Sequence, residues 1–167
     1  MTKRNVMITI KTSRLLIAEC LFDENAEYNE ESVNLHNGEL PESEEMLVEG
    51  RLVTNGERVE LLYEESEISG MQGSVTTIGF ERNTPGLISM NRTGTVLTSL
   101  VFEEGKRHFS VYDTIFSSFQ VCVRTLHVEN KLLTEGKIDI EYLIEIHGAQ
   151  AERCKMNILV CDAKELF

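Results

Sequence analysis

The feature that most constrains the fold of this chain is an alternation of apolar and polar residues with a period of two. The clearest example is the segment KIDIEYLIEIH at residues 137–147. One of its faces is polar or charged apart from Leu143, and the other consists of Ile138, Ile140, Tyr142, Ile144 and Ile146. Successive side chains of a β-strand point to opposite faces of the sheet. The segment therefore predicts an antiparallel strand with one buried face.

The same alternation recurs along most of the chain, in short runs separated by turn signals. The runs EMLVEGRLVTNG and ERVELLYEE flank Asn55-Gly56, a dipeptide that favours the tight turn of a β-hairpin. Residues 83–86, with the sequence NTPG, and Gly105 indicate two further turns between alternating runs. Counted in this way, the sequence predicts about ten short strands and no amphipathic helix.

The number of strands bears directly on the architecture. A meander of about ten strands leaves unpaired edges unless the sheet closes on itself. A chain of 167 residues is also the right length for one domain. We therefore expect residues 1–167 to form a single all-β domain, an antiparallel meander barrel of about ten strands. A β-sandwich is the alternative that local patterns leave open.

One segment lacks the alternation and carries most of the negative charge. No Lys or Arg occurs between Arg14 and Arg51, whereas carboxylates crowd this interval. The part from about residue 23 to residue 44 has no clear periodicity and includes Gly38 and Pro41. Such composition is typical of a solvated, mobile loop. A flap over one end of the domain is the sharper alternative, because long loops that are ordered often have a function.

The overall charge and the N-terminal sequence exclude several classes of function. The formal net charge is -12, which argues against binding to nucleic acid and to anionic membrane surfaces. The first residues, MTKRNVMITIKTSR, lack the uninterrupted apolar core of a signal peptide. No apolar run approaches the roughly 20 residues needed to span a bilayer. We expect a soluble, cytoplasmic protein.

Cysteine and histidine are too scattered to suggest a metal centre. The four cysteines, at positions 20, 122, 154 and 161, include no C-x-x-C pair, and the four histidines include no H-x-H or H-x-x-x-H pair. We expect reduced thiols without a disulfide, no bound metal and no cofactor.

The segment YEESEISGMQGSVTTIGFE at residues 63–81 is the one place where several carboxylates could act together. The apolar phase that ends at Tyr63 continues through Glu65 and Glu67, although a strand end followed by a bend is the simpler interpretation. Arg92 falls on the apolar phase of its own strand. An inward arginine needs a carboxylate partner, and we predict that Glu65 is this partner, with Tyr112 close by.

The same segment, followed by MNRTGTVLTSLVFEEGKRHFSVYDT and VCVRTLHVE, resembles the YwiB-like family of small bacterial proteins over nearly the whole chain. The resemblance implies a calycin-type β-barrel, the broad fold of lipocalins and fatty-acid-binding proteins, and implies no catalytic residue. The family's Y-x-T motif is typically followed by a Pro-aromatic-Gly turn, whereas this chain reads Ile115-Phe116-Ser117. By motif position the resemblance points to Tyr63, Glu65, Gly70, Gly73, Arg92, Gly94, Phe102, Tyr112, Thr114 and Thr125.

Three functions follow, in decreasing order of preference. The first is the binding of one small apolar or amphipathic molecule inside the barrel, unless the same polar residues plug the interior. The second is a protein-interaction or scaffold module that uses the acidic loop or a strand edge. The third is an enzyme with Glu65 or Glu67 as acid/base and Arg92 as an anion clamp. The predicted ligand-binding residues are Tyr63, Glu65, Arg92, Tyr112, Thr114 and Tyr142.

Overall fold

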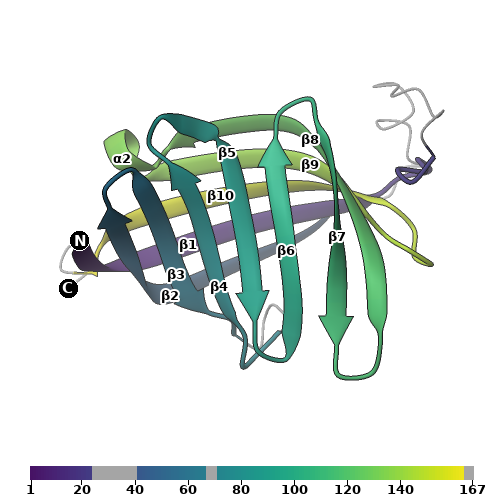
Figure 1. The fold of residues 1–167 in the computed structure, drawn as a ribbon, viewed down its shortest axis with the longest axis horizontal. Helices are drawn as coiled ribbons and strands as arrows, with labels where there is room; N and C mark the ends of the chain where they lie inside the picture. Colours follow the sequence, from purple (N-terminus) through teal and green to yellow (C-terminus); the bar gives the residue numbers. More distant parts are fainter. Residues whose placement is uncertain (24–40, 67–70, 164–167) are drawn as a thin grey trace.

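The computed structural model describes residues 1–23, 41–66 and 71–163. In these ranges the chain forms ten β-strands and one four-residue helix, α2, between β8 and β9 (Figure 1). The elements are β1 (Thr2–Leu16), β2 (Glu42–Asn55), β3 (Arg58–Glu64), β4 (Val75–Glu81), β5 (Thr84–Thr93), β6 (Val96–Glu103), β7 (Arg107–Thr114), β8 (Ser118–Lys131), α2 (Leu132–Glu135), β9 (Lys137–Ile146) and β10 (Glu152–Asp162).

The strands form a closed barrel in which each strand pairs with its neighbours in the sequence. Closure comes from β1, which pairs antiparallel with β2 on one side and with β10 on the other. In Figure 1 the first and last strands accordingly lie side by side. The predicted antiparallel barrel of about ten strands is therefore confirmed, and the sandwich alternative is wrong.

The second strand begins earlier than the sequence predicted. Residues 42–44 were placed in the acidic loop, but they belong to β2, where Glu42 lies opposite Arg14 and Glu44 opposite Thr12. The reason is that β1 extends to Leu16 and offers a full set of backbone partners, which bond to any side-chain type. The carboxylates stay exposed to solvent. The rest of the predicted acidic loop, residues 24–40, lies outside the described residues, and so does the flap.

The turn between β4 and β5 also differs from the prediction. Glu81 pairs with Thr84, so the turn consists of residues 82 and 83, and Pro85 already belongs to β5. A proline is tolerated near the start of a strand, where its missing N–H group does not interrupt an established ladder. The predicted β2–β3 hairpin is present, but its two-residue turn is Gly56-Glu57 rather than Asn55-Gly56, because Asn55 pairs with Arg58. Gly56, with φ of 61°, takes up the left-handed conformation in this turn.

Large apolar side chains fill one end of the barrel, near the β2–β3 turn and the start of β9. They pack as a single cluster with almost no exposed surface. The aromatic ring of Phe102 contacts that of Tyr142, with the ring centroids 4.8 Å apart, and marks the inner boundary of this packed end. Its largest fully buried members are Ile8, Leu61, Ile78, Phe80, Ile88, Met90, Phe102, Ile138, Ile140 and Ile158.

A second, smaller core lies on the outside of the barrel wall. The segment that follows β1 packs Ile17 and Leu21 against Cys122 of β8 and Leu143 of β9. Oε2 of Glu145 accepts hydrogen bonds from the backbone N–H groups of Leu21, at 2.6 Å, and of its neighbour in the chain. This packing explains why Leu143 interrupts the polar face of its strand: the residue points outward, yet its side chain is fully buried.

Candidate functional site

The barrel interior is hollow at the end opposite the packed core. A cavity of about 350 Å³ lies there, where the odd-numbered strands end and the even-numbered strands begin. Its lining is divided about equally between apolar side chains and polar or charged ones. The apolar part of the described lining consists of Ile10, Met46, Met71, Leu100, Val121, Ile144, Ile146, Ala149 and Met156.

One wall of this cavity carries a continuous row of polar side chains across five adjacent strands. The backbone register places Tyr63 opposite Thr76, Thr76 opposite Arg92, Arg92 opposite Thr98, and Thr98 opposite Tyr112. Residues paired in this way project from the same face of the sheet and lie within reach of each other. We call these five residues the polar row.

Glu65 lies next to the polar row and forms an ion pair with it. Nε of Arg92 lies 3.3 Å from Oε1 of Glu65 and 3.3 Å from the Thr76 hydroxyl, which donates a hydrogen bond of 2.5 Å to the same carboxylate oxygen. The Glu65 side chain is 1% exposed and that of Arg92 is 17% exposed. The ion pair that the alternation of β3 and β5 predicted is therefore present, and it is largely shielded from water.

Two connections between strands hold this pair in place. After β3, the N–H group of Glu65 donates to the carbonyl of Ser74, so the ladder continues past the end of the strand. The hydroxyl of Ser74 lies 2.8 Å from that of Thr95 in the β5–β6 turn. Gly94 allows the two connections to touch, because its φ is 129° and a Cβ atom there would lie 2.6 Å from the carbonyl oxygen of Gly73.

Burial keeps two tyrosines of the cavity, Tyr63 and Tyr142, in their neutral form. Burial raises the pKa of Tyr63 well above its usual range, and the neighbouring Glu65 charge raises it further. On the opposite wall burial likewise raises the pKa of Tyr142, and it raises that of the paired Cys154 thiol to about 12. These three groups can donate or accept hydrogen bonds, but they carry no charge near neutral pH.

The mouth of the cavity carries a second, more exposed ion pair. Nη2 of Arg14 lies 3.4 Å from Oε2 of Glu44, and both side chains are about two-fifths exposed. Glu152 also lines the cavity. With Arg92 and Glu65 further in, the described residues of the lining include two arginines and three glutamates. The cavity therefore has a slight excess of negative charge.

The structure brings most of the predicted ligand-binding residues to this cavity, but it places Thr114 elsewhere. The Thr114 hydroxyl lies in the β7–β8 turn, where it accepts hydrogen bonds from the N–H groups of Phe116, at 3.2 Å, and Ser117, at 3.1 Å. Thr114 has the inward phase, but β7 ends at this residue. Glu67 lies outside the described residues. The predicted residues that line the cavity are Tyr63, Glu65, Arg92, Tyr112 and Tyr142.

Sequence analysis missed the two threonines of the polar row. Thr76 precedes the buried Ile78 by two residues, and Thr98 precedes the buried Leu100 by two, so both have the inward phase. The period-two spacing of their strands therefore indicates that both threonines point into the barrel. Threonine is so common in strands that its presence there does not single out a site.

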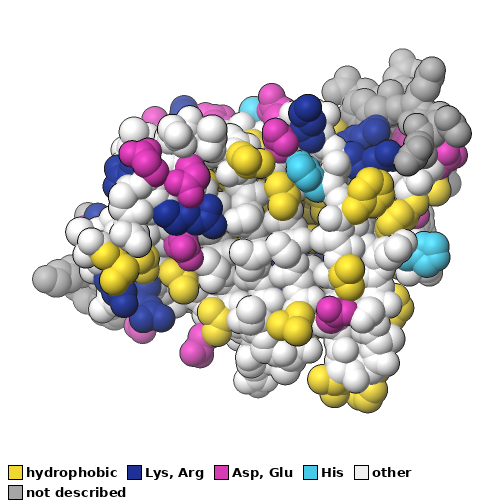
Figure 2. Space-filling view, viewed as in Figure 1, with side chains coloured by type: hydrophobic (Ala, Val, Ile, Leu, Met, Phe, Trp, Pro, Cys, Tyr) yellow, Lys and Arg dark blue, Asp and Glu magenta, His cyan; other side chains and the backbone are white. Residues whose placement is uncertain are grey.

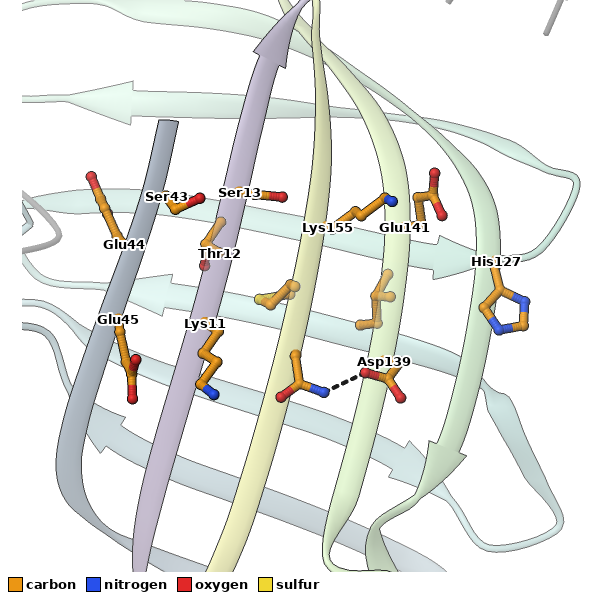
Figure 3. Close-up of a pocket in the computed structure, with 13 residues that line it drawn as sticks. Lys11, Thr12, Ser13, Ser43, Glu44, Glu45, His127, Asp139, Glu141 and Lys155 are labelled. Carbon is orange, nitrogen blue, oxygen red and sulfur yellow. Dashed lines mark hydrogen bonds between the residues drawn. The ribbon is translucent and has the colours of Figure 1, made fainter. Parts of the chain in front are cut away.

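A second hollow lies on the outer surface, over β1, β2, β8, β9 and β10. Figure 3 shows its labelled side chains, with Lys11 and Lys155 interleaved with Glu45, Asp139 and Glu141 on adjacent strands. Asn157 donates a hydrogen bond to Asp139. Such alternation of charges is typical of the solvated face of a half-buried sheet, and we regard this surface as structural.

Exposed apolar side chains gather at the tip of the β7–β8 hairpin. Ile115 is 82% exposed and Phe116 is 90% exposed, and Figure 2 shows apolar side chains at the lower tip of this hairpin. These residues occupy the turn for which YwiB-like sequences typically have Pro-aromatic-Gly. The Thr114 hydroxyl stabilises this turn in their place.

Within residues 1–23, 41–66 and 71–163, no cluster of three or more His, Cys, Asp or Glu side chains is arranged to hold a metal ion. All four cysteines are free thiols. The described residues also contain no helix of the length and apolarity needed to cross a membrane.

Together, the fold and the cavity define a class: a closed antiparallel barrel of ten strands, packed at one end and hollow at the other. The chain belongs to the family described as a domain of unknown function (DUF1934), whose model matches residues 29–158. The structure is similar to that of the ywiB protein from Bacillus subtilis, with a TM-score of 0.64, 15% sequence identity, and coverage of 94% of this chain and 92% of that one. The YwiB-like resemblance is thus confirmed, and at this identity the likeness shows the fold alone. A comparison with curated proteins found no match.

Proposed function

We propose that this protein binds one small amphipathic molecule in the hollow end of its barrel. The observation that carries the proposal is the cavity of about 350 Å³, in which a buried polar row faces apolar side chains. Pockets for small molecules commonly have this size, with mainly apolar walls and a few polar groups that fix orientation. The calycin-type relationship implied by the sequence is compatible with this use, because barrels of comparable size can enclose one ligand.

Blocking the cavity tests the proposal. Leu100 of β6 lines the cavity and is 5% exposed, whereas Leu97 of the same strand points outward and is 50% exposed. We expect the wild-type protein to enhance the fluorescence of Nile red, a neutral apolar dye, in a saturable manner. Leu100→Trp should weaken dye binding at least tenfold, and the matched Leu97→Trp variant should bind like the wild type. Dye binding that is absent in the wild type, or equal in both variants, would contradict the proposal.

Contact with another protein is the second candidate, favoured by the exposed Ile115 and Phe116 at the hairpin tip. It ranks below ligand binding, because these side chains lie on an open hairpin tip, whereas the cavity encloses a volume of about 350 Å³. An enzyme ranks third. Among the described residues, Arg92 and Thr76 already engage Oε1 of Glu65, the residue that would act as the acid or base.

A further inference from the structure

We propose that the ligand presents a neutral hydrogen-bond acceptor, such as the carbonyl group of an amide, ketone or ester, to the Arg92–Thr98–Tyr112 part of the polar row. This inference rests on the proposed ligand-binding function and specifies the chemical class of the ligand.

The first observation is a buried hydroxyl group without a partner. Thr98 is 7% exposed and lines the cavity, yet its Oγ1 atom makes no hydrogen bond within the described part of the chain. The large majority of buried polar side-chain atoms are hydrogen-bonded, because leaving one unpaired is unfavourable. The neighbours of Thr98 in the row are Arg92 and Tyr112, which also face the cavity. A bound polar group at this position would satisfy the hydroxyl.

The second observation concerns the N–H donors of Arg92 that make no hydrogen bond with the described residues. Its Nε group is directed at Glu65 and Thr76, whereas its two terminal nitrogens make no hydrogen bond among the described residues. An arginine side chain has five N–H donors and no acceptor. Arg92 lines the cavity, so a ligand group that meets these remaining donors must accept hydrogen bonds.

The third observation is the charge balance, which decides between a neutral acceptor and an anion. The charge of Arg92 is already compensated by Glu65, whose side chain is 1% exposed. A carboxylate or phosphate on the ligand would bury an additional negative charge beside Glu65, in a lining whose described residues include three glutamates and two arginines. A cation would have to approach Arg92. A neutral carbonyl accepts the free donors without either penalty.

The remainder of the ligand faces apolar side chains. Leu100, Val121, Ile144 and Met156 line the cavity around the polar row, so an alkyl or aromatic portion can be buried there while the carbonyl points at Arg92 and Thr98. This division matches a medium-chain amide in size and polarity, and it supplies a simple set of probes.

The test compares octanamide with octanoate, which has the same chain but is ionised at pH 7.5, by titration calorimetry and by displacement of Nile red. We expect octanamide to bind at least tenfold more tightly, which corresponds to about 1.4 kcal/mol. Thr98→Val should weaken octanamide binding about fivefold and leave unchanged the binding of diphenylhexatriene, a hydrocarbon dye without a hydrogen-bond acceptor. Thr98→Ser, which keeps the hydroxyl, should restore octanamide binding. The matched control is Ser99→Ala on the exposed side of β6, which should bind both probes like the wild type.

The outcomes separate this inference from the proposed function. Equal or tighter binding of octanoate, or an unchanged octanamide affinity in Thr98→Val, overturns the neutral-acceptor inference even when Nile red binds. Absence of Nile red binding to the folded wild-type protein overturns the ligand-binding function as well. Circular dichroism and thermal unfolding establish that each variant is folded.

Discussion

The guanidinium group of Arg92 and the carboxylate of Glu65 meet inside the barrel, with Nε and Oε1 3.3 Å apart, although 27 residues separate them in the chain. Thr76 bridges them, since its hydroxyl donates to Glu65 and accepts from Arg92. Three adjacent strands are thus joined by one buried polar cluster next to the cavity. Several measurable consequences follow from this arrangement and from its surroundings.

Removing the arginine should destabilise the fold strongly. In Arg92→Ala, the Glu65 carboxyl group would be left without its cationic partner at a site where its side chain is 1% exposed. Breaking a buried pair in this way costs about 3 kcal/mol or more, and urea denaturation at pH 7.5 measures the change in the free energy of unfolding. Arg51→Ala, an exposed position on β2, is the matched control and should change stability by no more than about 0.5 kcal/mol. Equal effects of the two substitutions would show that the pair contributes little.

Removing the unpaired hydroxyl should have the opposite effect. Thr98→Val replaces a buried oxygen that lacks a partner among the described residues, so the unfolding free energy of the ligand-free protein should rise by about 1 kcal/mol. The matched control is Thr125→Val, because the buried Thr125 hydroxyl accepts a hydrogen bond of 3.2 Å from the N–H group of Glu103. That variant should lose about 1–3 kcal/mol. A loss of stability in Thr98→Val comparable to that in Thr125→Val would mean that the Thr98 hydroxyl is satisfied after all.

The glycine that lets two connections touch should not tolerate a side chain. Gly94→Ala would bring a Cβ atom to 2.6 Å from the carbonyl oxygen of Gly73, at a φ of 129°. Strain of this kind costs about 1–3 kcal/mol, and a lower midpoint in urea denaturation would reveal it. Gly86→Ala is the control, because a Cβ atom there meets nothing within 4 Å. If both variants unfold at the same urea concentration, the close approach at Gly94 does not affect the free energy of unfolding.

The buried thiol predicts a loss of stability at alkaline pH. Burial raises the pKa of Cys154 to about 12 from a reference value of 9.0. The folded state thus holds a proton that the unfolded state releases first, so the contribution is complete below pH 9 and is lost as the pH rises toward 12. Between pH 8 and pH 10 the unfolding free energy should fall by about 1 kcal/mol through this group. Cys154→Val, which cannot ionise, should show a correspondingly smaller fall, and an identical fall in both proteins would argue against this assignment.

Local sequence patterns were sufficient for the strands and for the inward phase of Glu65, because period-two alternation is a property of neighbouring residues. They were not sufficient for Thr114, where the phase is correct but the strand ends and the hydroxyl is used by the turn. They also misplaced the start of β2, since pairing with Arg14 depends on the length of another strand.

The unpaired Thr98 hydroxyl could not be predicted from local sequence patterns. Whether a buried oxygen has a partner depends on every side chain that surrounds it, and its neighbours in the row come from β5 and β7. The cavity at the hollow end likewise depends on residues that are distant in the sequence. It is formed by residues from strands as distant as β1 and β10, and no short stretch of sequence specifies an unfilled volume.

The pairing of β1 with β10 also has a consequence for biosynthesis. One edge of β1 can pair only after the ribosome has added residues 152–162. Until then the sheet formed by the earlier strands cannot close into a barrel. During that interval the nascent chain presents an unpaired edge along β1 to its surroundings. The pairing of the last strand with β1 therefore closes the barrel. Chains that are released from the ribosome before β10 has been synthesised should be the species that chaperones and proteases encounter.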